Sequence, residues 1–336
     1  MRILYTIIIG LALVACQTPR KENKIIRGNA FGTTYSVIYH GNVSENVLVE
    51  EIDSVIEVFN KSVSTYDPES LISKFNAGDT TIVVDDIFKE VFFMSQEVYK
   101  NSNGYFDPTV GALRNAYGFG DVDGLESINQ NELDSIMEMV GFDKLHFNSN
   151  NTISKQHPKI YLDFNAIAKG YGVDRVAAVL EEHNLSNYLV EIGGELFAKG
   201  INVDKDVPWT VGIEGIQSDL ENRSYTHTLK LENAGMAASG NYRKFREDPV
   251  TGKQYVHTIN PITGSAERTD VTSATVVAQN CALADAYATT FMALGIEKSK
   301  ALLEKLDKVD AYLTYFDSEG AESSYATPGM KLRMMD

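Results

Sequence analysis

Apolar residues at helical spacing predict three amphipathic helices in the first half of the chain. From residue 44 to 60 apolar side chains recur every three or four positions, and Ser44 is placed to cap the start. A second helix is predicted over residues 87–99. A third is predicted over residues 132–140, ended by Gly141.

Beyond residue 150 short apolar runs bounded by Gly, Asp or Asn predict strands between helices. The predicted strands cover residues 187–192, 210–214, 226–231, 273–278 and 311–316, and the predicted helices cover residues 166–183, 282–294 and 297–307. Because strands and helices do not alternate one for one, the pattern indicates an α+β fold with mixed or antiparallel sheets and flanking helices. No repeat or low-complexity linker divides the chain, so residues 26–336 are predicted to form one compact catalytic unit.

The N-terminus has the pattern of a bacterial lipoprotein signal. Met1 and Arg2 precede an apolar run over residues 3–15, which is too short to span a bilayer as a permanent helix. The sequence "LVAC" resembles a lipobox, so residues 1–15 are predicted to be a signal peptide and Cys16 the lipid-bearing residue. An ordinary signal peptide with an incidental cysteine is the alternative interpretation. Residues 16–25 are polar and predict a tether. With Cys16 lipidated, only Cys281 remains, and no intramolecular disulfide is expected.

The formal net charge of −16 argues against nucleic-acid binding, because phosphate backbones are bound by clusters of Lys and Arg. An anionic substrate would therefore need a local cation in its site.

The sequence "DFNAIAKGYGVD", residues 163–174, has the composition of a phosphate-binding loop but lacks its spacing. It fits neither the Walker pattern nor the dinucleotide fingerprint. Asp163 instead follows a strand-like "KIYLDF", and a helix is predicted to open at Asn165 or Ala166, with Lys169 about one turn later. Free backbone donors at such a helix start favour anions. A capped surface helix is the alternative interpretation of the same residues.

The sequence "CALADAYATTFMALG", residues 281–295, predicts a crowded helix that carries Asp285 and Thr289 on one face. A carboxylate there requires a partner or a cation, and oxygen ligands suit Mg²⁺ or Ca²⁺ rather than zinc. Alternatively, the small residues only allow close packing and Asp285 forms a salt bridge.

Three further segments carry candidate chemistry. His257 stands beside a turn in "HTINPITG", where an imidazole can take a proton from a hydroxyl, although a lone histidine is more often structural. Residues 102–120 form an aromatic and glycine-rich loop where a flat ring could stack. Glu195, after a Gly-Gly pair, could pair with a cation, although solvent exposure is the simpler expectation.

The order of these motifs resembles the ApbE family, the FAD:protein FMN transferases, over nearly the whole mature chain. The matching runs are "FGTTY" (31–35), "STYDPES" (64–70), "GYFDPTVG" (104–111), "DFNAIAKGYGVD" (163–174), "EIGGE" (191–195), "ASGNY" (238–242), "HTINPITG" (257–264) and "ADAYATTFMALG" (284–295). The resemblance implies an α+β fold that binds FAD with Mg²⁺ on its pyrophosphate. It also implies transfer of FMN through a phosphoester to a Thr or Ser hydroxyl of an acceptor flavoprotein subunit, with release of AMP. The family's acceptors lie outside the cytoplasm, so the chain is expected in the bacterial cell envelope, on the periplasmic side and lipid-anchored to the membrane.

The resemblance also implies roles for individual residues. Asp285 and Thr289 match side-chain ligands of the metal, Ala166 and Ala288 match backbone ligands, and we expect His257 to act as the base. The positions that match FAD contacts are Phe31, Tyr66, Tyr105, Phe106, Asp107, Asp163, Lys169 and Ile259.

Two departures from the family pattern stand out. Phe31 replaces a frequent Met, and the turn "NPITG" over residues 260–264 lacks the acid and the arginine of the common Asp-Pro-Arg-Thr-Gly. Two other functions would use a similar site: a metal-dependent FAD pyrophosphatase, and a non-enzymatic FAD-binding lipoprotein.

Overall fold

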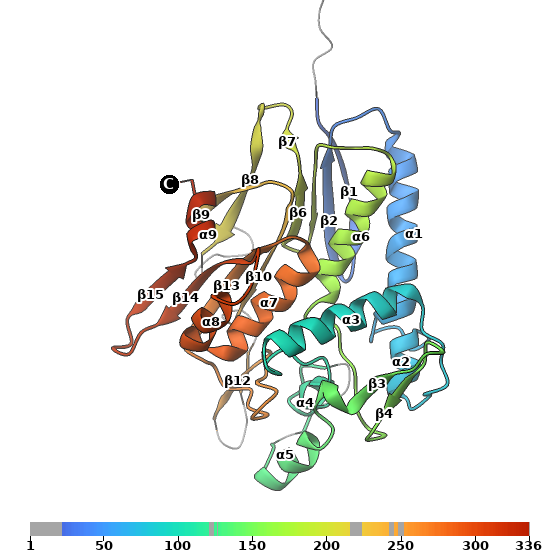
Figure 1. Cartoon of the computed structure of the whole chain (residues 1–336), viewed down its shortest axis with the longest axis vertical. Helices are drawn as coiled ribbons and strands as arrows, with labels where there is room; N and C mark the ends of the chain where they lie inside the picture. The colour runs from blue at the N-terminus through green and yellow to red at the C-terminus, as the bar shows by residue number, and fades with distance from the viewer. Residues whose placement is uncertain are drawn as a thin grey trace, which may run out of the picture.

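One antiparallel sheet of eight strands runs through the molecule in the order β1-β2-β5-β6-β10-β13-β14-β15 (Figure 1). The computed structural model describes residues 22–120, 124–125, 127–215, 224–241, 245–247 and 252–335. The strands are β1 (Lys24–Ala30), β2 (Thr33–Tyr39), β5 (Tyr188–Ile192), β6 (Glu195–Lys199), β10 (Ala234–Gly240), β13 (Val271–Ala278), β14 (Asp310–Phe316) and β15 (Glu322–Ala326). Side chains alternate between the two faces; in β5, Val190 joins the core under the helices and Leu189 packs on the opposite side.

Helices cover one face of this sheet. The helix α6 packs on β5 and β6, α7 packs on β10 and β13, and α1 packs outside α6 (Figure 1). Their bounds are α1 (Glu45–Val63), α3 (Asp86–Asn101), α6 (Ala168–Glu182) and α7 (Cys281–Leu294). Small residues let these elements approach closely. A Cβ on Gly170 would lie 2.3 Å from the Cys281 carbonyl oxygen, and one on Gly235 would lie 2.3 Å from the Cys281 nitrogen. The start of α7 is therefore wedged between α6 and β10.

The opposite face is covered by the β8–β9 pair, whose Trp209, Leu229 and Leu231 form a core with Met236 of the main sheet and Met330. The remaining elements are α2 (Leu71–Asn76), α4 (Gly111–Ala116), α5 (Gln130–Met137), a 3-10 helix (Phe142–Lys144), α8 (Ile296–Leu303), α9 (Pro328–Arg333), β3 (Leu145–Phe147), β4 (Ile153–Lys155), β7 (Ile201–Asn202), β8 (Val207–Glu214), β9 (Tyr225–Leu231), β11 (Phe245–Glu247) and β12 (Gln254–Val256).

The predicted α+β class is confirmed, and of the two predicted alternatives, mixed or antiparallel sheets, the structure has antiparallel ones. Several predicted bounds are corrected. Ser44 precedes α1, but its side chain makes no capping hydrogen bond. The helices α5 and α8 end at Met137 and Leu303, earlier than predicted.

The strand-like "KIYLDF" is not a strand. Its apolar side chains are buried, but within it only Tyr161 makes a β-bridge, to Val110. The side chain of Asn76 bonds both the N–H and the carbonyl of Leu162, each at 2.8 Å, and so replaces a neighbouring strand. The following helix begins at Ala168 rather than at Asn165 or Ala166, because the N–H of Asn165 donates to Asp163 and residues 164–167 form a turn.

The predicted signal peptide and Cys16 lie outside the described residues. The strand β1 takes in Lys24 and Ile25, which the sequence pattern assigned to the end of the tether. Within the part of the chain that the structure describes, no helix has the length and apolar character needed to cross a bilayer.

Candidate functional site

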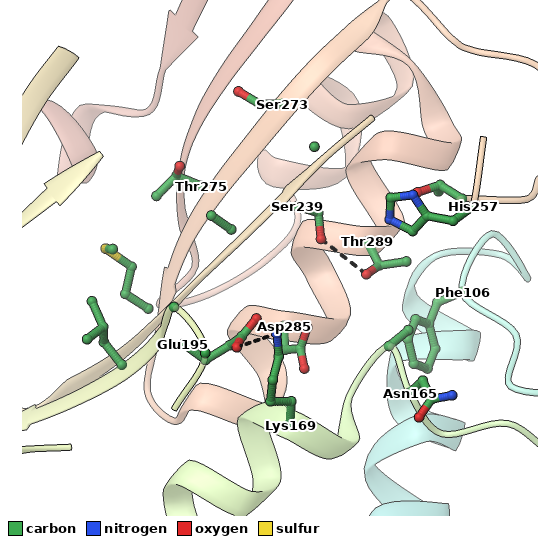
Figure 2. Close-up of a pocket in the computed structure, with 18 of the residues that line it drawn as sticks. Phe106, Asn165, Lys169, Glu195, Ser239, His257, Ser273, Thr275, Asp285 and Thr289 are labelled. Carbon is green, nitrogen blue, oxygen red and sulfur yellow. Dashed lines mark hydrogen bonds and ion pairs between the residues drawn. The ribbon is translucent and has the colours of Figure 1, made fainter. Parts of the chain in front are cut away.

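A cavity of about 790 Å³ opens where α6, α7, β6 and β10 meet. Its volume lies in the range that holds a cofactor-sized ligand. Figure 2 shows Lys169, Glu195, Ser239, Asp285 and Thr289 gathered in it from four separate elements.

The helix α7 presents its predicted metal-binding face to this cavity. Asp285 and Thr289 lie one turn apart and both line the wall. Asp285 is buried, and its Oδ2 accepts a hydrogen bond of 3.0 Å from the N–H of Gly170. The hydroxyl of Thr289 lies 3.3 Å from that of Ser239 (Figure 2). Burial raises the pKa of Asp285, so its charged form requires a cationic partner.

Lys169 supplies one such positive charge. Its Nζ lies 2.7 Å from Oε2 of Glu195, whose side chain is almost fully enclosed. The expectation that Glu195 is exposed to solvent is therefore wrong: a cation from another element allows the burial. Burial alone would lower the pKa of Lys169, but the carboxylates of Glu195 and Asp285 outweigh it and raise that pKa, which keeps the amine charged. Burial and the nearby Asp285 raise the pKa of Glu195 to about 8, while the ammonium of Lys169 opposes that rise. Because the two groups are in contact at 2.7 Å, we assign the charged form to both.

A second carboxylate fixes the start of α7. The two oxygens of Asp174 accept the N–H groups of Cys281 and Ala282, each at 2.8 Å. Burial raises the pKa of Asp174 to about 7, and these two hydrogen bonds oppose that rise. Because Asp174 belongs to α6, it ties the helix that carries Lys169 to the helix that carries Asp285.

The aromatic loop is held by buried hydrogen bonds at Asp107. Its Oδ1 accepts from the N–H and the hydroxyl of Thr109, and its Oδ2 accepts the N–H of Phe142 at 3.0 Å. Burial raises the pKa of Asp107 to about 6. Asp107 lines the cavity, but these bonds give it a structural part in shaping the loop.

Asp163 also lines the cavity and is paired internally. Its Oδ2 forms an ion pair with Arg114, and its Oδ1 accepts the N–H of Asn165 at 2.8 Å. A Cβ on Gly111 would lie 2.8 Å from the Tyr161 carbonyl, so glycine allows α4 to approach this segment. Arg114 is thereby brought to the cavity wall as a second cation.

The histidine turn forms a further wall of the cavity. His257, Ile259 and Pro261 line it. Oδ1 of Asn260 accepts the N–H of Ile262 at 2.9 Å, so the amide oxygen closes the turn as a carboxylate would. Ile262, where the family commonly has arginine, is half exposed.

The cavity collects all the predicted site residues among those described, apart from Phe31 and Ala288. The Phe31 ring packs against the Phe59 ring at 4.5 Å between centroids. Ala288 is fully buried inside α7. The predicted contacts of these residues with FAD and metal stay predictions.

Arg114 and Ser239 are among the cavity residues that the sequence pattern did not single out. Arg114 could not be recognised because its partner Asp163 lies on a distant segment of the chain. Ser239 lies in "ASGNY", and its hydroxyl is 3.3 Å from that of Thr289 in the cavity wall (Figure 2). Ser239 stands between two small residues on β10, and small residues in a strand often mark close approach of another element. This pattern could have indicated a hydroxyl next to α7.

The oxygen atoms near Asp285 are suitable ligands for a hard divalent cation. Such cations prefer carboxylate, hydroxyl and carbonyl oxygens. The N–H of Gly170, which would normally donate to the carbonyl four residues earlier, donates instead to Asp285. That carbonyl belongs to Ala166, which lines the cavity and is thus available for another contact. Among the described residues no group of three or more His, Cys, Asp or Glu is arranged to hold a metal, so a site here depends on main-chain and hydroxyl oxygens.

Residues 31–313 match the model of the ApbE family. The chain belongs to the ApbE family. An FAD:protein FMN transferase of Haemophilus influenzae is 37% identical over 309 residues, which span 88% of this chain and 87% of that protein. The expectation of a transferase agrees with the name of this relative.

Solved ApbE structures have the same fold. The flavin transferase ApbE from Vibrio cholerae matches with a TM-score of 0.81 and 32% identity, over 93% of this chain and 99% of that one. The apo form of the flavinyl transferase ApbE from Pseudomonas stutzeri matches with a TM-score of 0.80 and 27% identity, over 93% of this chain and 96% of that one.

Proposed function

We propose that this ApbE-family chain is a Mg²⁺-dependent FAD:protein FMN transferase. It would move FMN from FAD to a Thr or Ser hydroxyl of an acceptor protein and release AMP. The observation that carries the proposal is the convergence of Asp285, Thr289 and Lys169 in one cavity, in a chain whose relative of 37% identity bears this name.

Some residues of the cavity would supply charge, and others would hold the ligand in position. Asp285 and Thr289, with the carbonyls of Ala166 and Ala288, would hold Mg²⁺, and the bound cation would supply positive charge to offset that of the diphosphate. Lys169 adds a fixed ammonium beside them. The walls built from the aromatic loop and the histidine turn would hold the flavin and the nucleotide, and they fix the diphosphate relative to these charges.

We assign the base to His257. Its imidazole would accept the proton of the acceptor hydroxyl as that oxygen bonds to phosphorus and the bond from phosphorus to the AMP oxygen breaks. Support comes from its place in the cavity wall, just before the turn closed by Asn260. The variant His257→Asn is expected to bind FAD normally and to transfer FMN at least about 100-fold more slowly; transfer at the unchanged rate would remove this assignment.

We further propose that the chain acts in the cell envelope, anchored through lipid on Cys16. The N-terminal pattern supports this location, and it would place the catalytic unit beside membrane-bound acceptors.

The decisive experiment measures the product on the acceptor. The full chain in detergent is incubated with FAD, Mg²⁺ and a periplasmic-type flavoprotein domain, and intact mass spectrometry reports covalently bound FMN. We expect modified acceptor with Mg²⁺ and none with EDTA. Free FMN and AMP in place of modified acceptor would instead establish an FAD pyrophosphatase, and FAD bound without turnover would indicate a binding protein.

A further inference from the structure

Glu195 is a buried carboxylate in the cavity that the proposed reaction does not use. It opens β6, and only 5% of its side chain is exposed, against 34% for its partner Lys169. The acid is therefore enclosed in the wall, while the ammonium that it contacts at 2.7 Å lines the cavity.

The backbone of Glu195 is rigidly placed by the turn between β5 and β6. Gly193 and Gly194 have φ angles of 57° and 101°, a region that favours glycine. A Cβ on Gly193 would lie 2.7 Å from Thr33, and the N–H of Gly194 donates to Glu191 at 2.7 Å. Lys169, by contrast, carries its charge on a flexible four-carbon side chain. Because only 5% of its side chain is exposed, against 34% for Lys169, the acid is the more constrained member of the pair.

Stability alone does not account for this pair. Enclosing a carboxylate costs desolvation energy that the attraction to an amine often fails to recover, and apolar residues of similar size are often as stable. A role in placing the ammonium would account for this pair of charges in a wall that also holds Asp285.

Asp285 is the competing partner for the same ammonium. Both carboxylates attract Lys169. Without Glu195, the nearby negative charge would be that of Asp285, and the side chain of Lys169 is long enough to turn toward it. The ammonium would then cover the oxygen that the metal site requires.

We propose that Glu195 is the positioning residue for Lys169. It holds the ammonium in the cavity wall, where it meets the anionic diphosphate, and keeps it off Asp285. The inference rests on the proposed function in that FAD is the ligand.

A double-mutant cycle with FAD binding as the readout tests this role. The proteins are the full chain in detergent and its variants Glu195→Gln, Lys169→Met and the double variant, titrated with FAD by flavin fluorescence in the presence of Mg²⁺. We expect each single variant to bind FAD about 10-fold to 100-fold more weakly. The double variant is expected to bind no more weakly than Lys169→Met alone, because Glu195 acts through the lysine.

Two results would overturn the proposal. One is unchanged FAD affinity in Glu195→Gln. The other is that Glu195→Gln weakens FAD binding by the same factor in the wild-type chain and in the Lys169→Met variant. The matched control is Glu181→Gln, which removes the acid from the Lys199 pair at 2.6 Å on the surface and should leave FAD affinity unchanged. Should Glu195→Gln fail to fold, Glu195→Asp takes its place in the cycle, and an undiminished effect in the Lys169→Met background overturns the proposal.

The two proposals fail separately. A wild-type chain that binds FAD but modifies no acceptor would refute the transferase, while the binding cycle would still decide the role of Glu195.

Discussion

At the scale of residues, the cavity places a small number of charges so that each one has a defined partner. Asp285 accepts from Gly170, Lys169 contacts Glu195, and Arg114 pairs with Asp163. Fixed charges of this kind can act on a diphosphate without the reorganisation that water would require.

The neighbouring residues Thr289 and Thr290 offer a matched test of the metal face. Thr289→Val removes a cavity hydroxyl without changing the side-chain shape, and we expect FMN transfer to fall on the order of 100-fold at unchanged melting temperature. Thr290 is buried and donates to the Ala286 carbonyl at 2.7 Å, so Thr290→Val should cost about 1 kcal/mol of stability and leave transfer intact. Equal activity losses in the two variants would contradict the assignment of Thr289.

Asp107 should make stability depend on pH. Its pKa is raised to about 6 by burial, so between pH 4 and 6 the folded state binds more protons than the unfolded state. Protonated Asp107 therefore contributes to the free energy of unfolding at low pH, and this contribution is lost as pH rises through the folded pKa. The total change in unfolding free energy is roughly 3 kcal/mol at most. Urea unfolding at several pH values, compared with Asp107→Asn, measures this difference. Parallel curves for the two proteins would contradict it.

Residue patterns predicted some of these groups and hid others. Asp285 and Thr289 could be paired from the sequence because i and i+4 share a helix face. The burial of Glu195 could not be predicted, because its partner Lys169 belongs to a different element, and only the fold brings the two together.

At the scale of elements, the site depends on how closely α6, α7 and β10 approach. The glycines Gly170 and Gly235 leave room for the backbone at Cys281, and the same Gly170 supplies the N–H that Asp285 accepts. Packing and chemistry are thus combined in one crossing of two helices.

Gly170→Ala is therefore expected to impair both. The added methyl would meet main-chain atoms of Cys281 at 2.3 Å, and we expect a loss of about 1 to 3 kcal/mol in unfolding free energy together with weaker FAD binding. Gly41→Ala is the control, because its methyl would closely meet only the terminal carbon of the Leu185 side chain, and Gly41 does not line the cavity. Chemical denaturation and FAD titration of both variants measure the difference, and a larger loss in Gly41→Ala would refute this account.

The amphipathic elements were predictable, whereas "KIYLDF" was not. Periodicity located α1, α3 and the strands β5, β8, β9, β13 and β14, since each buries one face in a hydrophobic core. It did not predict β6, β10 and β15 of the main sheet. In "KIYLDF" the apolar spacing is that of a strand, but the Asn76 side chain takes the place of the neighbouring strand. A hydrogen bond from one polar side chain distant in the sequence does not change the hydrophobic periodicity of the segment, so the pattern could not predict it.

At the scale of the whole molecule, a catalytic unit on one antiparallel sheet follows an N-terminal segment with a lipoprotein pattern. Helices cover one face of the sheet and the β8–β9 pair covers the other, so the cavity has walls from both layers.

Cys16→Ala should release the protein from the membrane. We expect the wild-type chain to incorporate a radiolabelled fatty acid in bacterial cells and to fractionate with membranes, and the variant to do neither, because the lipid is the only predicted anchor. Cys281→Ala serves as the control, since Cys281 is buried. Membrane association of the Cys16→Ala variant to the wild-type extent would refute the predicted anchor.

The hydrogen bonds from the first residues of α7 to Asp174 should limit how α6 and α7 move relative to each other. Because Asp174 belongs to α6 and binds the start of α7, we expect Lys169 and Asp285 to keep their relative position during turnover. Any widening of the cavity on FAD binding should then come from movement of its other walls. Spectroscopic distance measurements should detect a change in distance between the His257 turn and α7, and no change between α6 and α7.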